Sequence, residues 1–343
     1  MEEKYDLMCS FRNLYNAHLR ARRGKRAKVE VIKFELDLAQ NLCTLQRQLQ
    51  QKTYQPSEYK HFFVYDPKIR SIFAPDYADR VVQHCLCDNI IMPTLEPRLI
   101  HDNAACRLGK GTHFSIYRMT DFLRTHFRKH GANGYFLKCD IRKYFENIDH
   151  SVLKGKLQGV FDENVHNLLC RIIDSYAAAE GKGLPLGNQT SQWFALYYLD
   201  GMDRLIKERL QIRHYVRYMD DFVLLHHDKA YLRRCLEEIR RLLADLRLDL
   251  NEKTQIFPIK NGVNYLGWHF YLTETGKVVR KLVLPSKRRF KRRMKLLQEK
   301  YAVGRIDGAA VKRSIMSSHG HLLHGHTYRL RAEVLGGAAF RRS

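Results

Sequence analysis

The chain has 343 residues, with 60 Lys and Arg against 36 Asp and Glu, and its formal net charge is +24. Such an excess has no use in folding, but it suits a polyanion such as nucleic acid, whose affinity comes largely from released counterions. The chain shows no apolar run long enough to span a bilayer, no signal peptide and no Cys-x-x-Cys pair. These features exclude a membrane-spanning protein and favour a reducing cytoplasm.

Basic side chains gather in the amino-terminal region. They are Arg20, Arg22, Arg23, Lys25, Arg26 and Lys28. We interpret them as a patch for structured RNA, with a localisation signal as the competing interpretation. Further along, Cys85 and Cys87 flank one residue on a predicted helix, which indicates core thiols rather than metal ligands.

The first candidate catalytic carboxylate ends a predicted buried strand. Asp140 follows the apolar residues 135–139 and precedes residues 141–145, a pattern typical of a strand, a turn and a helix. The backbone carbonyl of Ile141 is a further candidate metal ligand. Phe145, five residues past Asp140, is placed to lie under the sugar of a nucleotide, where a bulky ring would exclude a 2′-hydroxyl.

A segment rich in Gly and Pro, residues 183–192, separates the two groups of carboxylates. It predicts a turn that leads into a helix starting near Thr190, so that free backbone N–H groups and small side chains can approach a base pair closely. An ordinary helix N-cap is the competing interpretation. The position of the segment between Asp140 and Asp220 favours a functional loop.

Two adjacent carboxylates, Asp220 and Asp221, form the second group. Strand-forming residues at 214–217 and 222–225 flank them, which predicts a tight β-hairpin with the carboxylates at its tip. An isolated Asp-Asp pair usually marks a solvated turn, but a strand that ends in Asp140 can converge on this tip. Joining a nucleotide to a 3′ end needs two Mg²⁺ ions about 3.5–4 Å apart, held by carboxylate oxygens. The sequence therefore predicts a metal cage of these three carboxylates.

The segments after the hairpin predict a helix and a second hairpin. Apolar residues recur at helical spacing from Leu232 to Leu246, a pattern typical of a helix packed on a sheet. Residues 262–268 carry Gly at both ends of an apolar run and predict a second hairpin.

The carboxy-terminal part predicts a basic helix with an apolar edge, suited to following the backbone of a duplex. Its basic residues are Lys287, Arg288, Arg289, Lys291, Arg292, Arg293 and Lys295. Four histidines follow, His319, His321, His324 and His326. They could form a metal site, but the apolar residues among them favour packing and contacts with nucleic acid.

The chain resembles a prokaryotic reverse transcriptase. The resemblance is carried by Asp140, by residues 183–192 and by the Asp220-Asp221 hairpin. It covers nearly the whole length, from Arg70 to Trp268 by motif and more loosely on both sides. It implies synthesis of DNA from deoxynucleoside triphosphates on an RNA template, from a DNA or RNA primer. It also implies two Mg²⁺ ions, with Mn²⁺ as the alternative metal.

The subtype follows from the segment 183–192. Group II intron enzymes usually carry Gln before the Gly and Ser-Pro later, whereas this chain has Leu186 before Gly187 and then Ser191 and Gln192. This form is similar to the reverse transcriptases of diversity-generating retroelements, and antiviral defence reverse transcriptases are the next most similar. In the retroelement family an apolar residue at the position of Leu186 is associated with misincorporation opposite template adenine.

The resemblance assigns further roles. In the segment 68–73, Arg70 would neutralise the incoming triphosphate, and Arg107 would touch nucleotide or template, although either could be a surface charge. Lys253 could protonate the departing pyrophosphate or simply be solvated. The implied nucleotide-binding residues are Arg70, Arg107, Phe145, Leu186, Gly187 and Gln192. The implied primer grip is Tyr265, Leu266, Gly267 and Trp268.

The predicted fold is α/β, of the α+β kind. It is a right-handed polymerase fold with fingers, a palm of antiparallel sheet and helices, and a helical thumb. We expect the amino-terminal region and fingers at 1–135 and the palm at 136–275, with an interleaved fingers segment at about 150–182. A basic thumb is expected at 276–343, with no appended RNase H or endonuclease domain.

Three functions fit this sequence. The first is error-prone cDNA synthesis in a diversity-generating retroelement, with a noncoding RNA and a basic accessory protein as partners. The second is an anti-phage defence reverse transcriptase that makes DNA from a dedicated noncoding RNA. The third is a polymerase-derived RNA-binding protein without catalysis, against which the retained, mutually repelling carboxylates argue. Phe145 speaks against an RNA-dependent RNA polymerase. We expect a cytoplasmic, bacterial or phage-encoded protein without a membrane partner.

Overall fold

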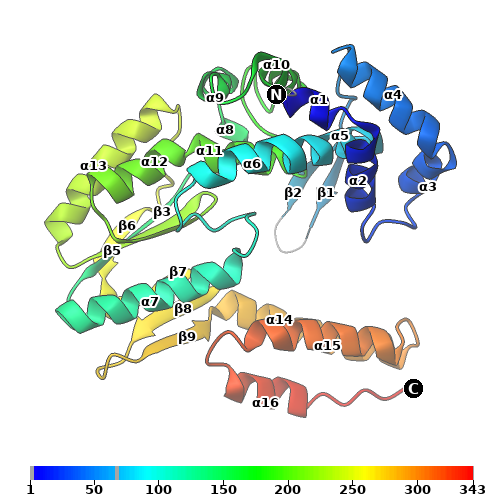
Figure 1. Ribbon diagram of the computed structural model, residues 1–343. Coiled ribbons are helices and arrows are strands. Elements are labelled where there is room, and N and C mark those ends of the chain that lie inside the picture. The colour runs from blue at the N-terminus through cyan, green and yellow to red at the C-terminus, as the bar shows by residue number, and fades with distance from the viewer. Residues whose placement is uncertain (1–3, 66–68, 343) are drawn as a thin grey trace.

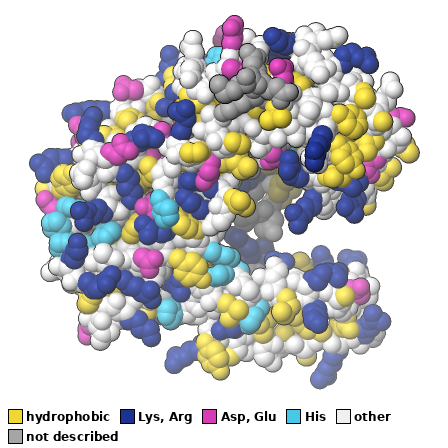
Figure 2. Space-filling view, in the orientation of Figure 1, with side chains coloured by type: hydrophobic (Ala, Val, Ile, Leu, Met, Phe, Trp, Pro, Cys, Tyr) yellow, Lys and Arg dark blue, Asp and Glu magenta, His cyan; other side chains and the backbone are white. Residues whose placement is uncertain are grey.

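The computed structural model describes residues 4–65 and 69–342, and Lys68 of the predicted fingers segment lies outside them. Antiparallel sheets and the helices around them form an open hand (Figure 1). The amino-terminal helices form one arm, the central sheet forms the base, and the carboxy-terminal helices form the other arm. Figure 2 shows the hollow between the arms, with Lys and Arg side chains on both of its sides. Within the described residues, no helix is long and apolar enough to cross a membrane.

The fingers consist of helices around a small hairpin. Strands β1 (Lys60–Val64) and β2 (Arg70–Ala74) pair antiparallel and project from the helices toward the hollow. The amphipathic pattern of the helices buries one face of each, and Cys85 and Cys87 are fully buried, as predicted. The helices are α1 (Lys4–Met8), α2 (Phe11–Ala21), α3 (Val29–Leu36), α4 (Leu38–Gln50), α5 (Tyr77–Leu86), the π-helix η1 (Cys87–Ile91), α6 (Met92–Leu95) and the 3-10 helix η2 (Glu96–Arg98).

The palm is built on a sheet in the order β4-β5-β3-β6. Its strands are β3 (Tyr135–Asp140), β4 (His214–Tyr218), β5 (Asp221–His226) and β6 (Gln255–Pro258). Both faces are covered, which explains the nearly continuous apolar runs. Phe136 packs with the apolar side of α7 (Thr112–His130), whereas Leu137 and Cys139 belong to the core on the other face.

Helices on that other face complete the palm. They are α8 (Tyr144–Asn147), α9 (His150–Leu157), α10 (Glu163–Asp174), α11 (Gln189–Tyr198), α12 (Asp200–Arg204), the π-helix η3 (Leu205–Arg209) and α13 (Lys229–Asp245). The predicted stripe of α13 lies against the sheet, with Leu232, Ile239 and Leu243 fully buried. The helix predicted near Thr190 begins one residue earlier, at Gln189.

A second sheet leads into the thumb. The 3-10 helix η4 (Ile259–Asn261) precedes β7 (Val263–Tyr265), β8 (Trp268–Leu272) and β9 (Val278–Leu282), which pair in that order. Leu266 and Gly267 form the predicted turn with φ of 47° and 84°, the backbone of a type I′ hairpin. The thumb helices are α14 (Leu284–Ala302), α15 (Gly308–Leu322) and α16 (Tyr328–Gly336). On α14, Phe290 and Met294 are buried while most basic side chains are exposed.

Candidate active site

The three predicted carboxylates lie at one end of the palm sheet. Strands β3 and β5 pair so that Asp140 stands directly opposite Asp221. Asp220 occupies the turn between β4 and β5, and its carbonyl oxygen accepts a hydrogen bond of 3.3 Å from the backbone N–H of Ile141. Directly opposed residues of an antiparallel pair have Cα atoms about 4.5–5.5 Å apart. The register therefore brings together two carboxylates that are 81 residues apart in sequence.

The three carboxylates of this cluster repel one another. Burial, together with the charges of Asp140 and Asp221, raises the pKa of Asp220 from 3.8 to about 6. Burial and Asp140 also raise the pKa of Asp221, while the charge of Lys138 opposes that rise. The fold thus holds these carboxylates where their ionised forms cost folding free energy. A nearby positive charge would reduce that free-energy cost.

Lys138 supplies such a charge, although no pattern in the sequence indicates a role for it. Its Nζ lies 2.6 Å from Oδ1 of Asp221, and the same ammonium lies 5.5 Å from the ring centroid of Tyr265. The side chain of Lys138 keeps a quarter of its surface exposed. Lys138 therefore connects the carboxylates to the hairpin predicted as the primer grip.

A buried ion pair fixes the turn that carries Asp220. Met219 has a φ of 57°, a left-handed backbone, and its carbonyl oxygen accepts a hydrogen bond of 3.0 Å from Arg217. Arg217 also donates to both carboxylate oxygens of Asp203, at 2.8 and 2.6 Å, and neither side chain of this pair is exposed. Tyr215 donates to the same carboxylate at 2.6 Å. In the sequence, the sign of this buried ion pair is one Arg inside a strand that is otherwise rich in aromatic and apolar residues.

The donor atoms fit a hard cation. Among the described residues, no three His, Cys, Asp or Glu side chains are close enough to hold one metal ion as they stand. The carboxylates nevertheless share one strand end and repel one another, and Ile141 directly follows Asp140 at that end. Carboxylate and carbonyl oxygens are the ligands that Mg²⁺ prefers, and rotation of the side chains could bring them onto one ion.

The segment 183–187 lies between Phe145 and the fingers. The N–H of Leu184 donates to the carbonyl of Phe145 at 2.7 Å. Gly187 has a φ of 123°, and a Cβ built there would lie 3.6 Å from Ile72 on β2, so the loop contacts the fingers hairpin. Phe145 is half-buried. The structure therefore places the predicted sugar-contacting residue and the predicted nucleotide loop side by side.

The other residues predicted to bind the nucleotide differ in how far they are exposed. Gln192 is exposed on α11, Leu186 is half-buried, and Arg70 is exposed at the start of β2, opposite Val64. Arg107 is nearly buried.

Arg107 is engaged within the fingers. Its guanidinium bonds to Glu96 at 2.8 Å and to the carbonyls of Ile100 and Asn103 at 2.6 and 2.8 Å. These bonds use the donors that a phosphate would need, because a guanidinium binds phosphate through paired N–H groups. We therefore interpret Arg107 as a structural residue of the fingers and leave it out of the proposed site.

Lys253 follows a segment that is tied to the first carboxylate. The N–H of Asn251 donates to the carbonyl of Asp140 at 2.7 Å, and the N–H of Lys253 donates to the side chain of Asn251 at 3.0 Å. Lys253 itself is exposed. These bonds tie the segment of Lys253 to the strand end that carries Asp140, and its role as a proton donor stays a prediction.

The predicted primer-grip hairpin has buried flanks and an accessible turn. Tyr265 and Trp268 are buried, and they face each other across the hairpin. The turn residues Leu266 and Gly267 are therefore the part that can touch a primer, while the two aromatic side chains support it.

The carboxy-terminal histidines join the thumb to its neighbours. The His324 ring stacks on His113 of α7 with centroids 3.6 Å apart, and its Nδ1 bonds to the hydroxyl of Tyr117 at 2.9 Å. The ring centroids of His321 and Trp268 are 5.4 Å apart. The backbone N–H of His326 donates to the carbonyl of Arg280 at 2.8 Å. These contacts agree with the packing role predicted for them.

Comparison with known proteins identifies the family of this arrangement. Residues 65–270 match the family model described as reverse transcriptase (RNA-dependent DNA polymerase). No curated protein matches the chain.

Solved telomerase structures share the fold. The chain is similar to telomerase from Candida albicans in complex with a TWJ fragment of telomeric RNA, with a TM-score of 0.52 and 14% identity over 85% of this chain and 58% of that one. It is also similar to apo telomerase from Candida tropicalis, with a TM-score of 0.50 and 13% identity over 66% of this chain and 49% of that one. The chain thus spans about half the length of these proteins. At such identities the likeness concerns the fold alone, and it confirms the predicted fingers, palm and thumb.

Proposed function

The chain belongs to the reverse transcriptase family, and on this basis we propose that it extends a primer on an RNA template by two-metal-ion nucleotidyl transfer. The observation that supports this most is the pairing of Asp140 opposite Asp221 with Asp220 in the adjoining turn. A polymerase needs such a group of carboxylates on rigid strands.

Reverse transcriptases generally use divalent metal ions, typically Mg²⁺. In our proposal Asp140, Asp220, Asp221 and the carbonyl of Ile141 hold these ions. When bound, they supply the positive charge that stabilises the attacking and leaving oxygens. Arg217 keeps the Asp220 turn in place, because its guanidinium holds the preceding carbonyl.

In this proposal, residues near the carboxylates select the substrate. Phe145 would lie under the sugar and favour deoxynucleotides over ribonucleotides. Leu186 and Gly187 would contact the new base pair, Arg70 would neutralise the triphosphate, and the turn of the 262–268 hairpin would hold the primer end. The basic face of α14 would follow the duplex backbone, because its exposed cations lie away from the buried residues Phe290 and Met294.

We propose error-prone cDNA synthesis in a diversity-generating retroelement as the biological role. Leu186 supports it, because an apolar residue before Gly187 is the form associated with careless copying in that family. A noncoding RNA and a basic accessory protein would be the partners. The telomerase from Candida albicans, which shares the fold, was solved with an RNA fragment bound, and this is consistent with an RNA partner.

Primer extension tests both levels of the proposal. Wild-type protein and Asp220→Asn would each receive an RNA template, a primer, Mg²⁺ and all four deoxynucleotides, and every product would be sequenced. Templated DNA from the wild type alone, with errors concentrated at template adenines, is the expected result. Accurate, repetitive or untemplated DNA would instead indicate the defence role. No synthesis, even with the native RNA and partner supplied, would overturn the enzymatic proposal.

A further inference from the structure

A nearly buried histidine, His150, holds one end of the segment 183–187. It is the first residue of α9 and is 5% exposed. Its Nε2 lies 2.7 Å from the carbonyl oxygen of Gly183. A carbonyl oxygen can only accept a hydrogen bond, so Nε2 carries a proton and donates it to Gly183.

The peptide group that His150 binds is also bonded to Phe145. The carbonyl of Gly183 and the N–H of Leu184 belong to one peptide group, and that N–H donates to the carbonyl of Phe145 at 2.7 Å. A peptide group is planar, so its two ends cannot turn independently. The bond from His150 therefore also fixes the N–H that holds the backbone of Phe145.

Gly183 needs this support because its backbone is unusually free. Its φ is 105°, and a Cβ built there would lie 2.7 Å from the Cβ of Ala178, so a larger residue does not fit without a shift. Glycine has the largest conformational freedom of any residue. The N–H of Gly183 donates to the carbonyl of Ile148 at 2.8 Å, and His150 binds its carbonyl. The two bonds together fix a residue that would otherwise turn easily.

The imidazole of His150 starts from a fixed backbone. The nearly buried carboxylate of Asp149 accepts two backbone N–H bonds in the first turn of α9, at 3.0 and 3.1 Å, and binds Arg247 at 2.7 Å. The N–H of His150 itself donates to the carbonyl of Gly181 at 2.9 Å. The position of the ring is therefore set by α9 and not by the segment that it holds.

A cavity of about 690 Å³ borders the ring of His150. Nδ1 of His150 lies 3.5 Å from one carboxylate oxygen of Asp174, and Lys154 binds the other oxygen at 2.5 Å. His166 lines the same cavity, but its Nε2 bonds to the carbonyl of Lys154 at 3.1 Å. The cavity thus contains one histidine bonded to the segment 183–187 and one bonded to α9.

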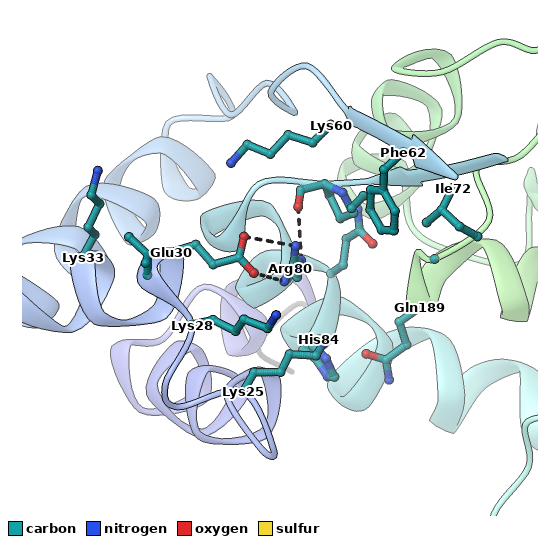
Figure 3. A pocket seen from close by; sticks show the side chains of 15 residues that line it. Lys25, Lys28, Glu30, Lys33, Lys60, Phe62, Ile72, Arg80, His84 and Gln189 are labelled. Carbon is teal, nitrogen blue, oxygen red and sulfur yellow. Dashed lines mark hydrogen bonds and ion pairs between the residues drawn. The ribbon is translucent and has the colours of Figure 1, made fainter. Parts of the chain in front are cut away.

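The other end of the segment contacts the fingers. Gly187 and Gln189 line a separate cavity of about 820 Å³ together with Ile72 of β2, and Figure 3 shows Ile72 and Gln189 on its wall. The side chain of Asn188 donates to the hydroxyl of Tyr59 at 2.8 Å. This end therefore depends on the fingers, whereas the end at Gly183 is bonded to α8 and α9.

We propose that His150 is a positioning residue for sugar selection. Its bond to Gly183 keeps the segment 183–187 and Phe145 at the spacing that accepts a deoxynucleotide and excludes a 2′-hydroxyl. This inference rests on the proposed function, in which Phe145 lies under the sugar. His150 touches neither nucleotide nor metal, and it acts through the peptide group between Gly183 and Leu184. Without the donor, the Gly183 carbonyl loses its partner and the peptide group can turn away from Phe145.

Substitutions in the full chain separate the hydrogen bond from the bulk of the side chain. His150→Gln keeps an N–H close to the position of Nε2, whereas the amide of His150→Asn ends near the position of Nδ1 and does not reach Gly183. His150→Leu fills the site without a donor and replaces the Asn variant if that variant fails to fold. His166→Asn is the matched control, because it removes a partly buried histidine from the same cavity.

Hydrogen exchange measured by mass spectrometry tests the support of the segment without catalysis. In peptides that span residues 178–190, His150→Asn should speed exchange of the Leu184 amide about tenfold, because that N–H loses its fixed partner. His150→Gln and His166→Asn should exchange like the wild type. Equal exchange in His150→Asn and His166→Asn would overturn the proposal.

Single-nucleotide extension tests the effect on the substrate, with kcat and KM measured for a deoxynucleotide and for the matching ribonucleotide. His150→Asn should raise the KM for the deoxynucleotide about tenfold and lower the preference for it about threefold, and His150→Gln should restore both. In a Phe145→Ala background, His150→Asn should change the sugar preference no further, because it acts through Phe145.

The kinetic outcomes distinguish positioning from a purely structural role. A variant that only reduces the folded fraction lowers kcat and leaves KM and the sugar preference unchanged, and that result would overturn the proposal. An additive change of preference in the double variant would overturn the route through Phe145. A wild-type chain that makes no DNA would refute the proposed function, and the exchange rates would still decide whether His150 holds the segment.

Discussion

Replacing Asp220 by Asn should stabilise the metal-free protein at neutral pH. Burial and the neighbouring carboxylates raise the pKa of Asp220 from 3.8 to about 6, so its ionised form costs folding free energy. The difference between these values corresponds to at most about 3 kcal/mol. Because Asp220 is half-buried, solvent screens part of this cost, and we expect the free energy of unfolding to rise by about 1–2 kcal/mol.

The pH dependence identifies the cause of this gain. A carboxyl with a raised pKa costs stability above that pKa, and the cost fades as the pH falls from about 6 toward 3.8, because the folded state takes up its proton first. The gain of Asp220→Asn should therefore be full at neutral pH and shrink progressively below pH 6. Asparagine keeps a side-chain oxygen, so a carboxylate charge is lost without removing the acceptor.

Differential scanning calorimetry without divalent metal is the assay, and a gain of about 1.5–3 °C in the thermal midpoint is expected for a chain of this length. Asp221→Asn is the matched control: the pKa of Asp221 is also raised, but the ion pair with Lys138 offsets part of the cost of its charge, so this variant should give a smaller gain. Added Mg²⁺ should then raise the midpoint of the wild type more than that of Asp220→Asn. A lower midpoint for Asp220→Asn at neutral pH, or a gain that does not change with pH, would refute the electrostatic reasoning.

Two further substitutions test the supports of the site. Phe145→Ala should increase the use of ribonucleotides relative to deoxynucleotides about tenfold or more, measured as the ratio of kcat/KM values, and an unchanged ratio would remove Phe145 from sugar selection. Arg217→Met should lower the free energy of unfolding by about 3–5 kcal/mol in urea titrations, because it leaves Asp203 charged and buried without a partner. Adding Asp203→Leu should recover part of that loss, and a double variant less stable than Arg217→Met would contradict this explanation.

Local patterns in the sequence were sufficient to predict the strands and the hairpins of the site. Apolar runs that end in Asp140 or begin after Asp221 specify strands, and the strand propensities around the Asp-Asp pair specify the turn. The helix positions followed in the same way from their amphipathic spacing. Those signals depend only on neighbouring residues, so no knowledge of the tertiary structure was needed.

The register between distant strands could not be predicted from such signals, and the missed residues depend on it. Lys138 and Asp140 share one face of β3 because side chains alternate along a strand. Once Asp140 is paired with Asp221, Lys138 becomes the diagonal neighbour of Asp221, within reach of a long side chain. Arg107 illustrates the same limit, since its predicted contact with nucleotide or template needs an accessible side chain, whereas its bonds to residues 96–103 bury it.

Arg217 and Lys138, the two cations near the carboxylates, differ in burial and in the number of bonds that hold them. That difference suits the proposed metal-dependent reaction. Arg217 is fully buried, binds Asp203 through two hydrogen bonds and holds the carbonyl of Met219, so it can fix the backbone but cannot leave. Lys138 is partly exposed and holds Asp221 through one contact, so it can release that carboxylate when a stronger charge arrives. The backbone of the site is therefore held by Arg217, whereas the charge that faces Asp221 can be replaced. In the proposed function, Lys138 would compensate the repulsion between the carboxylates until a metal ion takes its place.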